Sequence, residues 1–421
     1  MNMVDIGKRA RTASRVLARA TSEDKNTVLN TIADILASAS GSILVANSKD
    51  ITQARQAGLN EAMLDRLLLT QERLSGIIQE LRSVVHLADP VGEIVDEKTL
   101  PSGLKVSRRR VPIGVLAVIY EARPNVTIDV AGLAIKTGNA VILRGGSETI
   151  NTNRALASLI RSALVDHGLP ADSVQFIDDP DRSRVLELIH MYEYVDMLIP
   201  RGGATLHQFC RENSRVPVIT GGIGICHLFV DESADQAAAL RVIQNAKVQR
   251  PSVCNALDTA LIHRSIAEEF LPRLIALLEE DSVSFRADES VLPYLRLSDG
   301  SLPRSVTPAG SGDFDREWLS LVLGLKVVAD LNQAIEHIAQ HSTNHSDGIL
   351  TQDDANARQF VAEVDSAAVY VNASTRFTDG SQLGLGAEVA VSTQRLHARG
   401  PMGLRELTTY KWVVVGDYSV R

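Results

Sequence analysis

The sequence predicts an α/β protein built on a doubly wound, mostly parallel sheet. Between Ile113 and Thr220 short apolar strands alternate with helical segments, and a second round of the same alternation begins near Gly222. Alternation of this kind places helices on both faces of a parallel sheet. The 421 residues are 45% hydrophobic, so the chain is long enough to bury the cores of two or three domains.

Composition and charge exclude several classes of protein. The 43 basic and 51 acidic residues give a formal net charge of −8, which predicts no surface for nucleic acid. The cysteines Cys210, Cys226 and Cys254 have no paired spacing, which fits a reducing, cytoplasmic compartment and neither a disulfide framework nor a zinc ribbon. The sequence shows no signal-peptide core and no apolar run of about 18 residues, so we expect neither secretion nor a membrane span.

Helices are expected at the start of the chain. From Thr21 onward apolar residues recur with helical spacing, and Thr21 and Asp24 have the spacing of a capping pair. A second helical pattern runs from Leu64 to Leu81 and ends before Asp89-Pro90, because the residue before proline is pushed away from helical geometry. The sequence therefore predicts two long helices ahead of any sheet.

The segment from Val91 to Pro112 is predicted to form a β-hairpin. Two strand-like runs flank a turn at Pro101-Ser102-Gly103, and residues 104–107 alternate between apolar and polar side chains. The arginine run at 108–110 has the charge to bind anions, but a run of like charges is more often a solvated strand edge. We assign no chemistry to it.

Five strands and two helices are expected in the first α/β domain. Helices over 126–137 and 150–167 each end at a glycine, which is a common helix stop. The expected strands cover residues 115–120, 141–143, 174–177, 197–199 and 218–219. In such a sheet ligands bind at the carboxyl ends of the strands.

Two of these strands end in glycine loops that lead into helical segments. The loops are Leu143-Arg144-Gly145-Gly146-Ser147 and Ile199-Pro200-Arg201-Gly202-Gly203-Ala204. Glycine lets the backbone approach an anion, a helix start offers unpaired N–H groups, and each loop carries an arginine. One Gly-Gly pair after a strand is more often a plain turn, but two at the same edge of one sheet predict phosphate binding. A third run, Gly221-Gly222-Ile223-Gly224, precedes a strand and so is not a dinucleotide fingerprint.

The second α/β unit contains the most distinctive stretch, Gln249-Arg250-Pro251-Ser252-Val253-Cys254-Asn255-Ala256. A cysteine in a cytosolic chain is most often a small buried hydrophobe. Here, however, Pro251 and Ser252 break the preceding helix, expected over 233–247, and a strand is expected over 256–262. Arg250 adds positive charge nearby, and a thiol in this setting can be held as thiolate. Cys254 is therefore a candidate nucleophile.

The rest of the second unit is expected to continue the alternation. Helices are predicted over 265–278 and 331–340 and around Phe360, and strands over 321–329, 348–350 and 367–371. His337 and His341 lie one turn apart and His345 follows, but no motif completes a metal site, so we predict surface histidines and no metal. The segment 372–403 is expected to form a functional loop. The chain should close with a strand over 411–415, paired in this chain or in a neighbour.

Several motifs in one order resemble the aldehyde dehydrogenase superfamily over nearly the whole chain. They are Val111-Pro112-Ile113-Gly114-Val115, Tyr120-Glu121-Ala122-Arg123-Pro124-Asn125-Val126-Thr127, the first glycine loop, the Cys254 stretch and Leu396-His397-Ala398-Arg399-Gly400-Pro401-Met402-Gly403. The resemblance implies a Rossmann-type cofactor-binding domain over 1–221, with an arm hairpin at about 91–112. It also implies a catalytic domain over 222–385, a return to the first domain with an arm strand over 386–421, and a homo-oligomer joined through the arm.

The resemblance also implies a reaction. The family's nucleophile falls on Cys254, and the asparagine that joins the cysteine N–H in an oxyanion hole falls on Asn125. The family's water-activating glutamate is replaced by Thr220, which favours reduction of an acyl phosphate over hydrolysis of a thioester. Within the family, the implied reaction converts L-glutamyl 5-phosphate to L-glutamate 5-semialdehyde and phosphate with NADPH, in proline biosynthesis. Glutamate 5-kinase is then a candidate partner.

Cofactor and substrate contacts follow from the same resemblance. The implied cofactor contacts are Arg144, Gly145, Gly146, Ser147, Arg201, Gly202, Gly203 and Glu317. Ser147 stands where NAD-preferring relatives place a glutamate, so no carboxylate there repels a 2′-phosphate, and Arg144 is its candidate partner. Glu317 matches the contact to the nicotinamide ribose. The cationic candidates for the substrate are Arg123, Arg376 and Arg399, with surface arginine as the alternative for each.

Two other functions remain open at this point. The chain is alternatively an oxidoreductase of another aldehyde or acyl phosphate, of different chain length. It is also compatible with a binding or regulatory protein that keeps the fold without turnover, for instance as a scaffold for the preceding kinase. The pairing of Cys254 with Asn125 argues against the second alternative.

Overall fold

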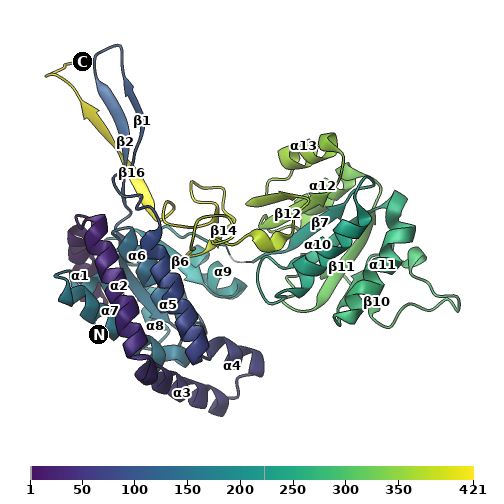
Figure 1. Cartoon of the computed structure of the whole chain (residues 1–421), viewed down its shortest axis with the longest axis horizontal. Coiled ribbons are helices and arrows are strands. Elements are labelled where there is room, and N and C mark those ends of the chain that lie inside the picture. The colour runs from purple at the N-terminus through teal and green to yellow at the C-terminus, as the bar shows by residue number, and fades with distance from the viewer. Residues whose placement is uncertain (1, 222) are drawn as a thin grey trace. The chain divides into compact units, whose positions relative to one another are not determined.

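A computed structural model describes residues 2–221 and 223–421 of the chain (Figure 1). They form two compact units. The first contains Met1–Thr220, Gly384–Ala390 and Met402–Arg421, and the second contains Gly221–Leu383 and Val391–Pro401. Gly222, where the sequence predicts the second domain to begin, lies outside the described residues. The segment Val391–Pro401 belongs to the second unit, whereas the prediction assigns all of 386–421 to the first.

Five helices precede the first strand, so the prediction of two is wrong. They are α1 (Met3–Leu17), α2 (Ser22–Ser38), α3 (Ser40–Gln56), α4 (Glu61–Leu67) and α5 (Gln71–His86). The start of α2 is as predicted, because Thr21 and Asp24 form a complete capping box. The pattern expected as one helix over 64–81 is divided, because Thr70 caps a new helix by accepting the N–H of Arg73.

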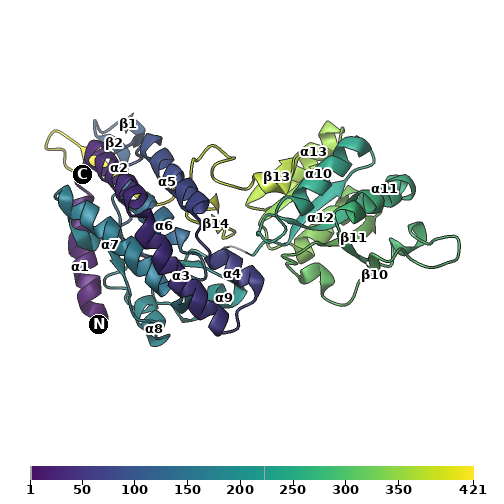
Figure 2. The same ribbon diagram turned by 60° about the horizontal axis from the view of Figure 1, so that its bottom comes forward.

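The N-terminal helices are packed into the first unit. α2 and α5 lie side by side and contact α6 (Asn125–Lys136), and α2 also contacts α7 (Ile150–Asp166) (Figure 2). Val28, Leu29 and Ile32 of α2 are all buried. In the described part of the chain no single helix is long and apolar enough to span a membrane. α2 and α3 together reach the required length and hydropathy, but the pair is bent by 70°.

A four-stranded parallel sheet forms the centre of the first unit. Its order is β5-β4-β3-β6, with β3 (Val115–Tyr120), β4 (Ala140–Gly145), β5 (Val174–Phe176) and β6 (Met197–Arg201). α6, α7, α8 (Ser183–Ile189) and α9 (Ala204–Asn213) follow or join these strands. All residues of β3 are buried, as expected for a central parallel strand. The predicted α/β class is confirmed, but Val218 forms only an isolated bridge to Leu198 and not the expected strand.

The second unit is built on a seven-stranded parallel sheet in the order β10-β9-β11-β8-β7-β12-β13. The strands are β7 (Cys226–Val230), β8 (Leu257–His263), β9 (Ser284–Ala287), β10 (Val306–Pro308), β11 (Val322–Val328), β12 (Ser346–Leu350) and β13 (Ala368–Val371). Leu228 and Val230 pack towards α10 (Gln236–Val248) and α11 (Ala267–Glu280). Phe229 packs towards α12 (Leu331–His341) and α13 (Asp354–Glu363). Alternate residues of one strand therefore bury into helices on opposite faces.

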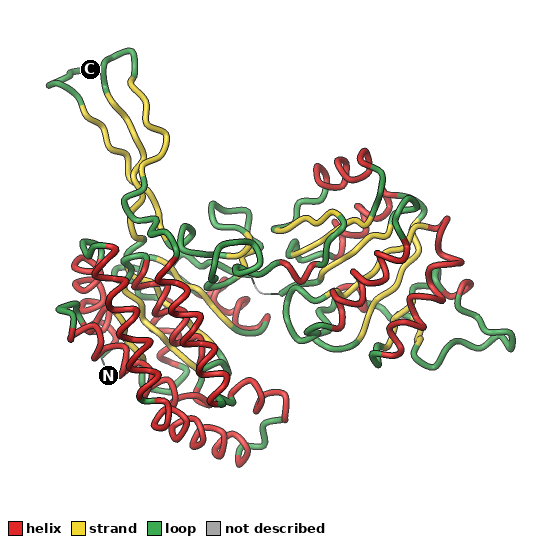
Figure 3. The backbone as a smooth tube through the Cα atoms, in the orientation of Figure 1, coloured by secondary structure: helices red, strands yellow, loops and turns green. Residues whose placement is uncertain are grey.

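The predicted hairpin is present and is joined by the last strand. β1 (Ile94–Thr99), β2 (Lys105–Pro112) and β16 (Thr408–Val415) form an antiparallel sheet in the order β1-β2-β16, with no helix over it (Figure 3). β2 is thus the central strand, and the expectation that residues 108–110 form a strand edge is wrong. Arg108 pairs with Asp96, and Arg110 lies 3.1 Å from Glu93. The short pair β14 (Val391–Ser392) and β15 (Gly400–Pro401) lies in the second unit.

The histidines of the second unit are mostly interior. His337 and His345 are 4% and 0% exposed, so the prediction of surface histidines is wrong for both. Burial lowers the pKa of His337 to about 2, which keeps this imidazole neutral. Within residues 2–221 and 223–421 no group of three His, Cys, Asp or Glu side chains is arranged to hold a metal ion.

Candidate active site

The carboxyl ends of β3, β4 and β6 form one edge of the sheet in the first unit. Tyr120, the last residue of β3, pairs with Gly145 of β4 on one side and with Arg201 of β6 on the other. The strand order reverses at β3, which is where open α/β sheets bind their ligands. The two predicted glycine loops therefore flank the same strand end, as the sequence predicts.

In the first glycine loop the glycines lie in close contact with neighbouring side chains. A Cβ at Gly145 would lie 2.2 Å from the amide of Asn153, and one at Gly146 would lie 2.1 Å from the carboxylate of Glu148. Glu148 also accepts the N–H of Ala122 at 2.7 Å. Ser147 is exposed and begins a 3-10 turn (Ser147–Thr149) that leads into α7. The exposed group at this helix start is thus a hydroxyl, with the carboxylate of Glu148 turned onto the backbone.

Arg144 is buried beside this loop. Its Nη1 donates to the carbonyl of Gly145 and its Nη2 to that of Pro180, both at 2.9 Å. Burial lowers the pKa of Arg144, and the nearby cation of Arg182 lowers it further. Its Nε has no acceptor among the described residues. A buried guanidinium with a donor to spare and a second cation close by is compatible with an anionic ligand.

The second glycine loop is covered by a carboxylate that the sequence did not indicate. Gly203 donates its N–H to Glu121 at 3.3 Å, and a Cβ at Gly202 would lie 2.5 Å from the same carboxylate. A phosphate cannot bind this N–H while Glu121 accepts it. The pKa of His207 is lowered to about 4, mainly by burial and also by the positive charge of Arg201. This imidazole beside the loop is therefore neutral at pH 7.

The predicted oxyanion-hole residue, Asn125, is the first residue of α6. Its amide Nδ2 donates to Oδ2 of Asp129, one helical turn later, at 2.9 Å. Burial, with the neighbouring charge of Glu80, raises the pKa of Asp129 to about 7. Arg123, two residues before Asn125, is exposed. The backbone turns sharply just ahead of it, because Ala122 has φ +45°.

Cys254 lies in the loop between α10 and β8, at the amino ends of the strands in the second unit. The side chain is half-buried. The thiol of Cys226 donates to the backbone carbonyl of Cys254 at 3.3 Å. On another side, a Cβ at Gly224 would lie 1.6 Å from the same carbonyl oxygen, so only glycine fits there. The peptide after the thiol is therefore fixed by two neighbours.

The residue after the thiol connects this loop to residues 374–378. Asn255 donates to the carbonyl of Thr378 at 2.9 Å, and Thr375 donates to the carbonyl of Asn255 at 2.7 Å. Arg376 donates to Asn255 and also to Gln249, the latter at 3.0 Å. Burial and the charge of Arg250 lower the pKa of Arg376, while the thiol of Cys254 raises it. Arg376 is thus within electrostatic reach of Cys254, where a cation favours the thiolate.

The other two predicted substrate arginines differ from Arg376. Arg399 donates to the carboxylate of Asp365 and to the Asp365 carbonyl, each at 2.6 Å, so its guanidinium is used within the second unit. Arg123 is part of the first unit and follows the end of β3. Within the second unit the structure therefore brings one predicted arginine, Arg376, to the Cys254 loop.

Glu317 is connected to the same loop through glycine. It accepts the N–H of Gly224 at 2.9 Å, and burial raises its pKa. The next residue, Trp318, donates its N–H to Asp258 at 3.1 Å. Asp258 is 2% exposed, lies 3.7 Å from the buried amine of Lys247, and has its pKa raised to about 6 by burial. Sequence analysis missed Lys247 and Asp258, although each is a charged residue flanking the Cys254 stretch.

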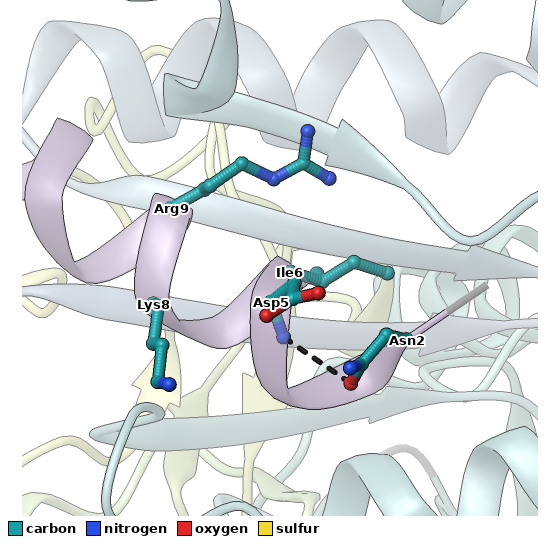
Figure 4. A pocket seen from close by; sticks show the side chains of 5 residues that line it. All are labelled: Asn2, Asp5, Ile6, Lys8 and Arg9. Atoms are coloured by element: carbon teal, nitrogen blue, oxygen red, sulfur yellow. Dashed lines mark hydrogen bonds between the residues drawn. The ribbon is translucent and has the colours of Figure 1, made fainter.

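A surface pocket of about 620 Å³ lies elsewhere, at the start of α1 (Figure 4). Asn2, Asp5, Ile6, Lys8 and Arg9 line it. The side chain of Asn2 accepts backbone N–H groups there and caps the helix. None of the predicted site residues lines this pocket, so we assign it no part in the chemistry.

Comparison with known proteins gives one consistent result. Residues 2–291 match the model of the aldehyde dehydrogenase family. The chain is 58% identical over 416 residues to a gamma-glutamyl phosphate reductase of Escherichia coli, and the match covers 99% of both proteins. The crystal structure of a gamma-glutamyl phosphate reductase from Thermotoga maritima is similar over 100% of both chains, with TM-score 0.96 and 48% identity. A Saccharomyces cerevisiae protein of the same name covers 99% and 98%, with TM-score 0.53 and 32% identity.

The close approach at Gly224 predicts a strong effect of one methyl group. We expect Gly224→Ala to lower the free energy of unfolding of the second unit by about 3 kcal/mol, because the backbone oxygen that it meets cannot rotate away. Denaturant unfolding gives the stability, and the rate of iodoacetamide alkylation at Cys254, followed by mass spectrometry, should change severalfold.

The control for this variant is Gly76→Ala, in the exposed interior of α5 with no atom near the added methyl. It should stay within about 1 kcal/mol of the wild type, on the stabilising side. Equal stability and equal alkylation rates for both variants would show that Gly224 does not constrain the thiol.

Proposed function

The chain belongs to the aldehyde dehydrogenase family, and on this premise we propose that it reduces L-glutamyl 5-phosphate to L-glutamate 5-semialdehyde and phosphate, as in proline biosynthesis. The observation that carries the proposal is the full-length similarity to proteins named gamma-glutamyl phosphate reductase. The setting of Cys254 adds chemical support, because the residue is half-buried, its charge interacts with that of Arg376, and its backbone carbonyl is held by its neighbours.

Cys254 is the proposed nucleophile. Its thiolate attacks the acyl carbon, the C–O bond to phosphate breaks, and a thioester forms at Sγ. Phosphate is a good leaving group that needs little protonation, so no strong general acid is required at this step. After reduction, the C–S bond breaks, and aldehyde and free thiolate are released. The contacts to the carbonyl of Cys254 fix the backbone that carries the thiol.

Asn125 is proposed to stabilise the negative charge that forms on attack, and Thr220 is proposed to leave the thioester unhydrolysed. Asn125 donates an N–H to the oxygen that gains negative charge on attack, the role its family position implies. Thr220 stands where oxidising members of the family carry a water-activating glutamate. A threonine hydroxyl is a poor general base at neutral pH, so hydrolysis of the thioester is not promoted. The thioester therefore persists until it is reduced.

The reductant is proposed to be NADPH, which supplies a hydride to the thioester carbon when bound. The residues at the strand edge of the first unit fit its phosphate-bearing end. Ser147 presents no carboxylate, while Arg144 has a free Nε–H and Arg182 lies close enough to affect its pKa. The other predicted contacts to this cofactor are Arg201, Gly202 and Gly203. For a phosphate to bind the N–H of Gly203, the carboxylate of Glu121 must first release that N–H. Glu317 is the proposed contact to the nicotinamide ribose.

The substrate carries a carboxylate and a phosphate and so requires cations. We propose Arg376 as the main one, because its charge interacts with Cys254. Arg123 is a second, since it is exposed two residues before Asn125. Arg399 is a weaker proposal, because Asp365 already takes its guanidinium. Glutamate 5-kinase, which makes the acyl phosphate, and a cytoplasmic location remain predictions. The location is predicted from the three cysteines, whose spacing in the sequence fits a reducing compartment.

Substrate and nucleophile can be tested in one assay. We expect the purified chain to oxidise glutamate semialdehyde with NADP⁺ only when phosphate is present, and Cys254→Ser to lower kcat by at least about 10³-fold, because a hydroxyl is a far weaker nucleophile at neutral pH. Cofactor absorbance measures the rate. In the reducing direction, glutamyl, aspartyl and acetyl phosphate are compared in parallel, and faster turnover of either alternative would replace the proposed substrate.

The cofactor preference depends on one exposed side chain. We expect NADPH to exceed NADH in kcat/KM, and Ser147→Glu to lower kcat/KM for NADPH by about 100-fold, because a carboxylate beside a 2′-phosphate costs a few kcal/mol. Ser147→Gln is the matched control, with nearly the same shape and no charge, and should change the preference by less than about tenfold. A wild-type preference for NADH would contradict the proposal.

Self-association is proposed through the arm β1-β2-β16. Both faces of this sheet are largely exposed, and Trp412 and Val414 of β16 are 58% and 55% exposed. The guanidinium of Arg108 stacks over the ring of Tyr410, 4.6 Å from its centroid. A three-stranded sheet without a covering layer has little apolar burial of its own, so a second copy of the chain is the natural cover.

The arm proposal predicts that charge on β16 weakens the oligomer. We expect Trp412→Glu with Val414→Glu to reduce the mass measured by light scattering towards that of one chain, because the carboxylates must be desolvated on association. Val45→Glu, at a 60% exposed position on α3, is the control and should leave the mass unchanged. A wild-type chain that scatters as a monomer at all concentrations would disprove the proposal.

A further inference from the structure

The side-chain amide of Asn125 has two N–H donors and one of them is already used. Nδ2 donates to Oδ2 of Asp129 at 2.9 Å. An amide nitrogen carries two hydrogens at a fixed angle, so a bond through one of them sets the direction of the other. Asp129 is therefore in a position to decide where the second N–H of Asn125 points.

The helix makes this contact a consequence of spacing. Asn125 begins α6, and Asp129 lies four residues later on the same face, which is the separation at which helical side chains meet. Side chains also lean towards the start of the helix, so Asp129 reaches back to Asn125. Val126, Ile128 and Val130 between and beside them are buried, which fixes the helix and the pair with it.

We propose that Asp129 is a positioning residue, whose carboxylate orients the Asn125 amide so that its second N–H points at the developing oxyanion. The inference rests on the proposed function, because it assumes that Asn125 donates to that oxygen. Without Asp129 the amide rotates about χ2, and its carbonyl oxygen can take the place of the donor. A carbonyl oxygen facing an oxyanion repels it, so misorientation removes one donor and adds a repulsive dipole.

The ionisation state of Asp129 makes the orientation sensitive to pH. As a carboxylate it only accepts hydrogen bonds, which fixes Nδ2 towards it. As a carboxylic acid it can donate its O–H to Oδ1 of Asn125. This bond requires the amide to rotate by half a turn about χ2, which exchanges the positions of Oδ1 and Nδ2. The charged groups that affect it are Glu80 on α5, which raises its pKa, and Arg201 at the end of β6, which lowers it. With a pKa of about 7, turnover should fall as pH drops from 8 to 6.

The test is a double-mutant cycle on kcat with NADPH and L-glutamyl 5-phosphate. We expect Asn125→Ala to lower kcat by about 100-fold and Asp129→Ala by about tenfold. In the Asn125→Ala background, Asp129→Ala should have less than about a twofold further effect, because the amide that it orients is gone. Asp129→Asn keeps an acceptor oxygen of the same shape. It should recover most of kcat at pH 8 and lose the fall between pH 8 and pH 6.

Two further measurements separate positioning from structural or binding roles. Glu80→Gln should keep kcat at pH 8 and shift the fall in activity to lower pH, because one carboxylate no longer raises the pKa of the other. The thermal midpoint and the alkylation rate of Cys254 should be the same in all variants. An equal loss from Asp129→Ala with and without Asn125, or a rise in KM with kcat unchanged, would overturn the inference.

Failure of the inference and failure of the proposed function give different results. A wild-type chain that turns over none of the acyl phosphates disproves the proposed function, and the role of Asn125 with it. A wild-type chain that reduces L-glutamyl 5-phosphate, with Asn125→Ala impaired and Asp129→Ala fully active at every pH, supports the proposed function and rejects Asp129 alone.

Discussion

The contact on which the Cys254 loop of the second unit depends is the approach of the Gly224 backbone to the carbonyl of Cys254. No side chain fits between them, since a Cβ would lie 1.6 Å from the oxygen. The N–H of Gly224 is in turn held by Glu317, and Trp318 beside it is held by Asp258. The thiol of Cys226, at the start of β7, also donates to the carbonyl of Cys254. One peptide thus joins Cys254, the proposed nucleophile, to the segments before β7 and β11.

The two units place their functional residues at opposite ends of parallel strands. In the first unit the glycine loops and Asn125 follow the carboxyl ends of β3, β4 and β6, which is the usual ligand edge of such a sheet. In the second unit Cys254, Gly224 and Glu317 precede β8, β7 and β11, at the amino ends. Fold class therefore locates the cofactor edge but not the thiol, and the Cys254 stretch had to be identified from its own sequence.

Helices and strands with strong local sequence signals were predicted correctly, and those with weak signals were missed. The capping pair at Thr21 and the continuous apolar run of β3 placed α2 and the central strand. α1 was missed because small residues, Gly7, Ala10, Ala13 and Ser14, separate the large apolar residues of its buried face. α3 was missed because it has no side-chain cap and buries polar Asn47, which bonds the backbone of Leu67 and Leu69. Glu121 and Asp258 were missed because their partners lie 82 and 60 residues away.

The carboxylates among and beside the proposed site residues have settings that the proposed ligands explain. Both the acyl phosphate and NADPH carry several negative charges, and an ionised carboxylate beside either would repel it. Burial raises the pKa of Asp129 to about 7, that of Asp258 to about 6, and that of Glu317. Of the three, Asp129 is therefore the one that is partly protonated at neutral pH. Glu121 and Glu148 instead accept backbone N–H groups. Asp129 differs from these two, because it accepts the Asn125 amide. Only its ionised form fixes that amide, so its raised pKa of about 7 sets the pH above which the amide is held in one orientation.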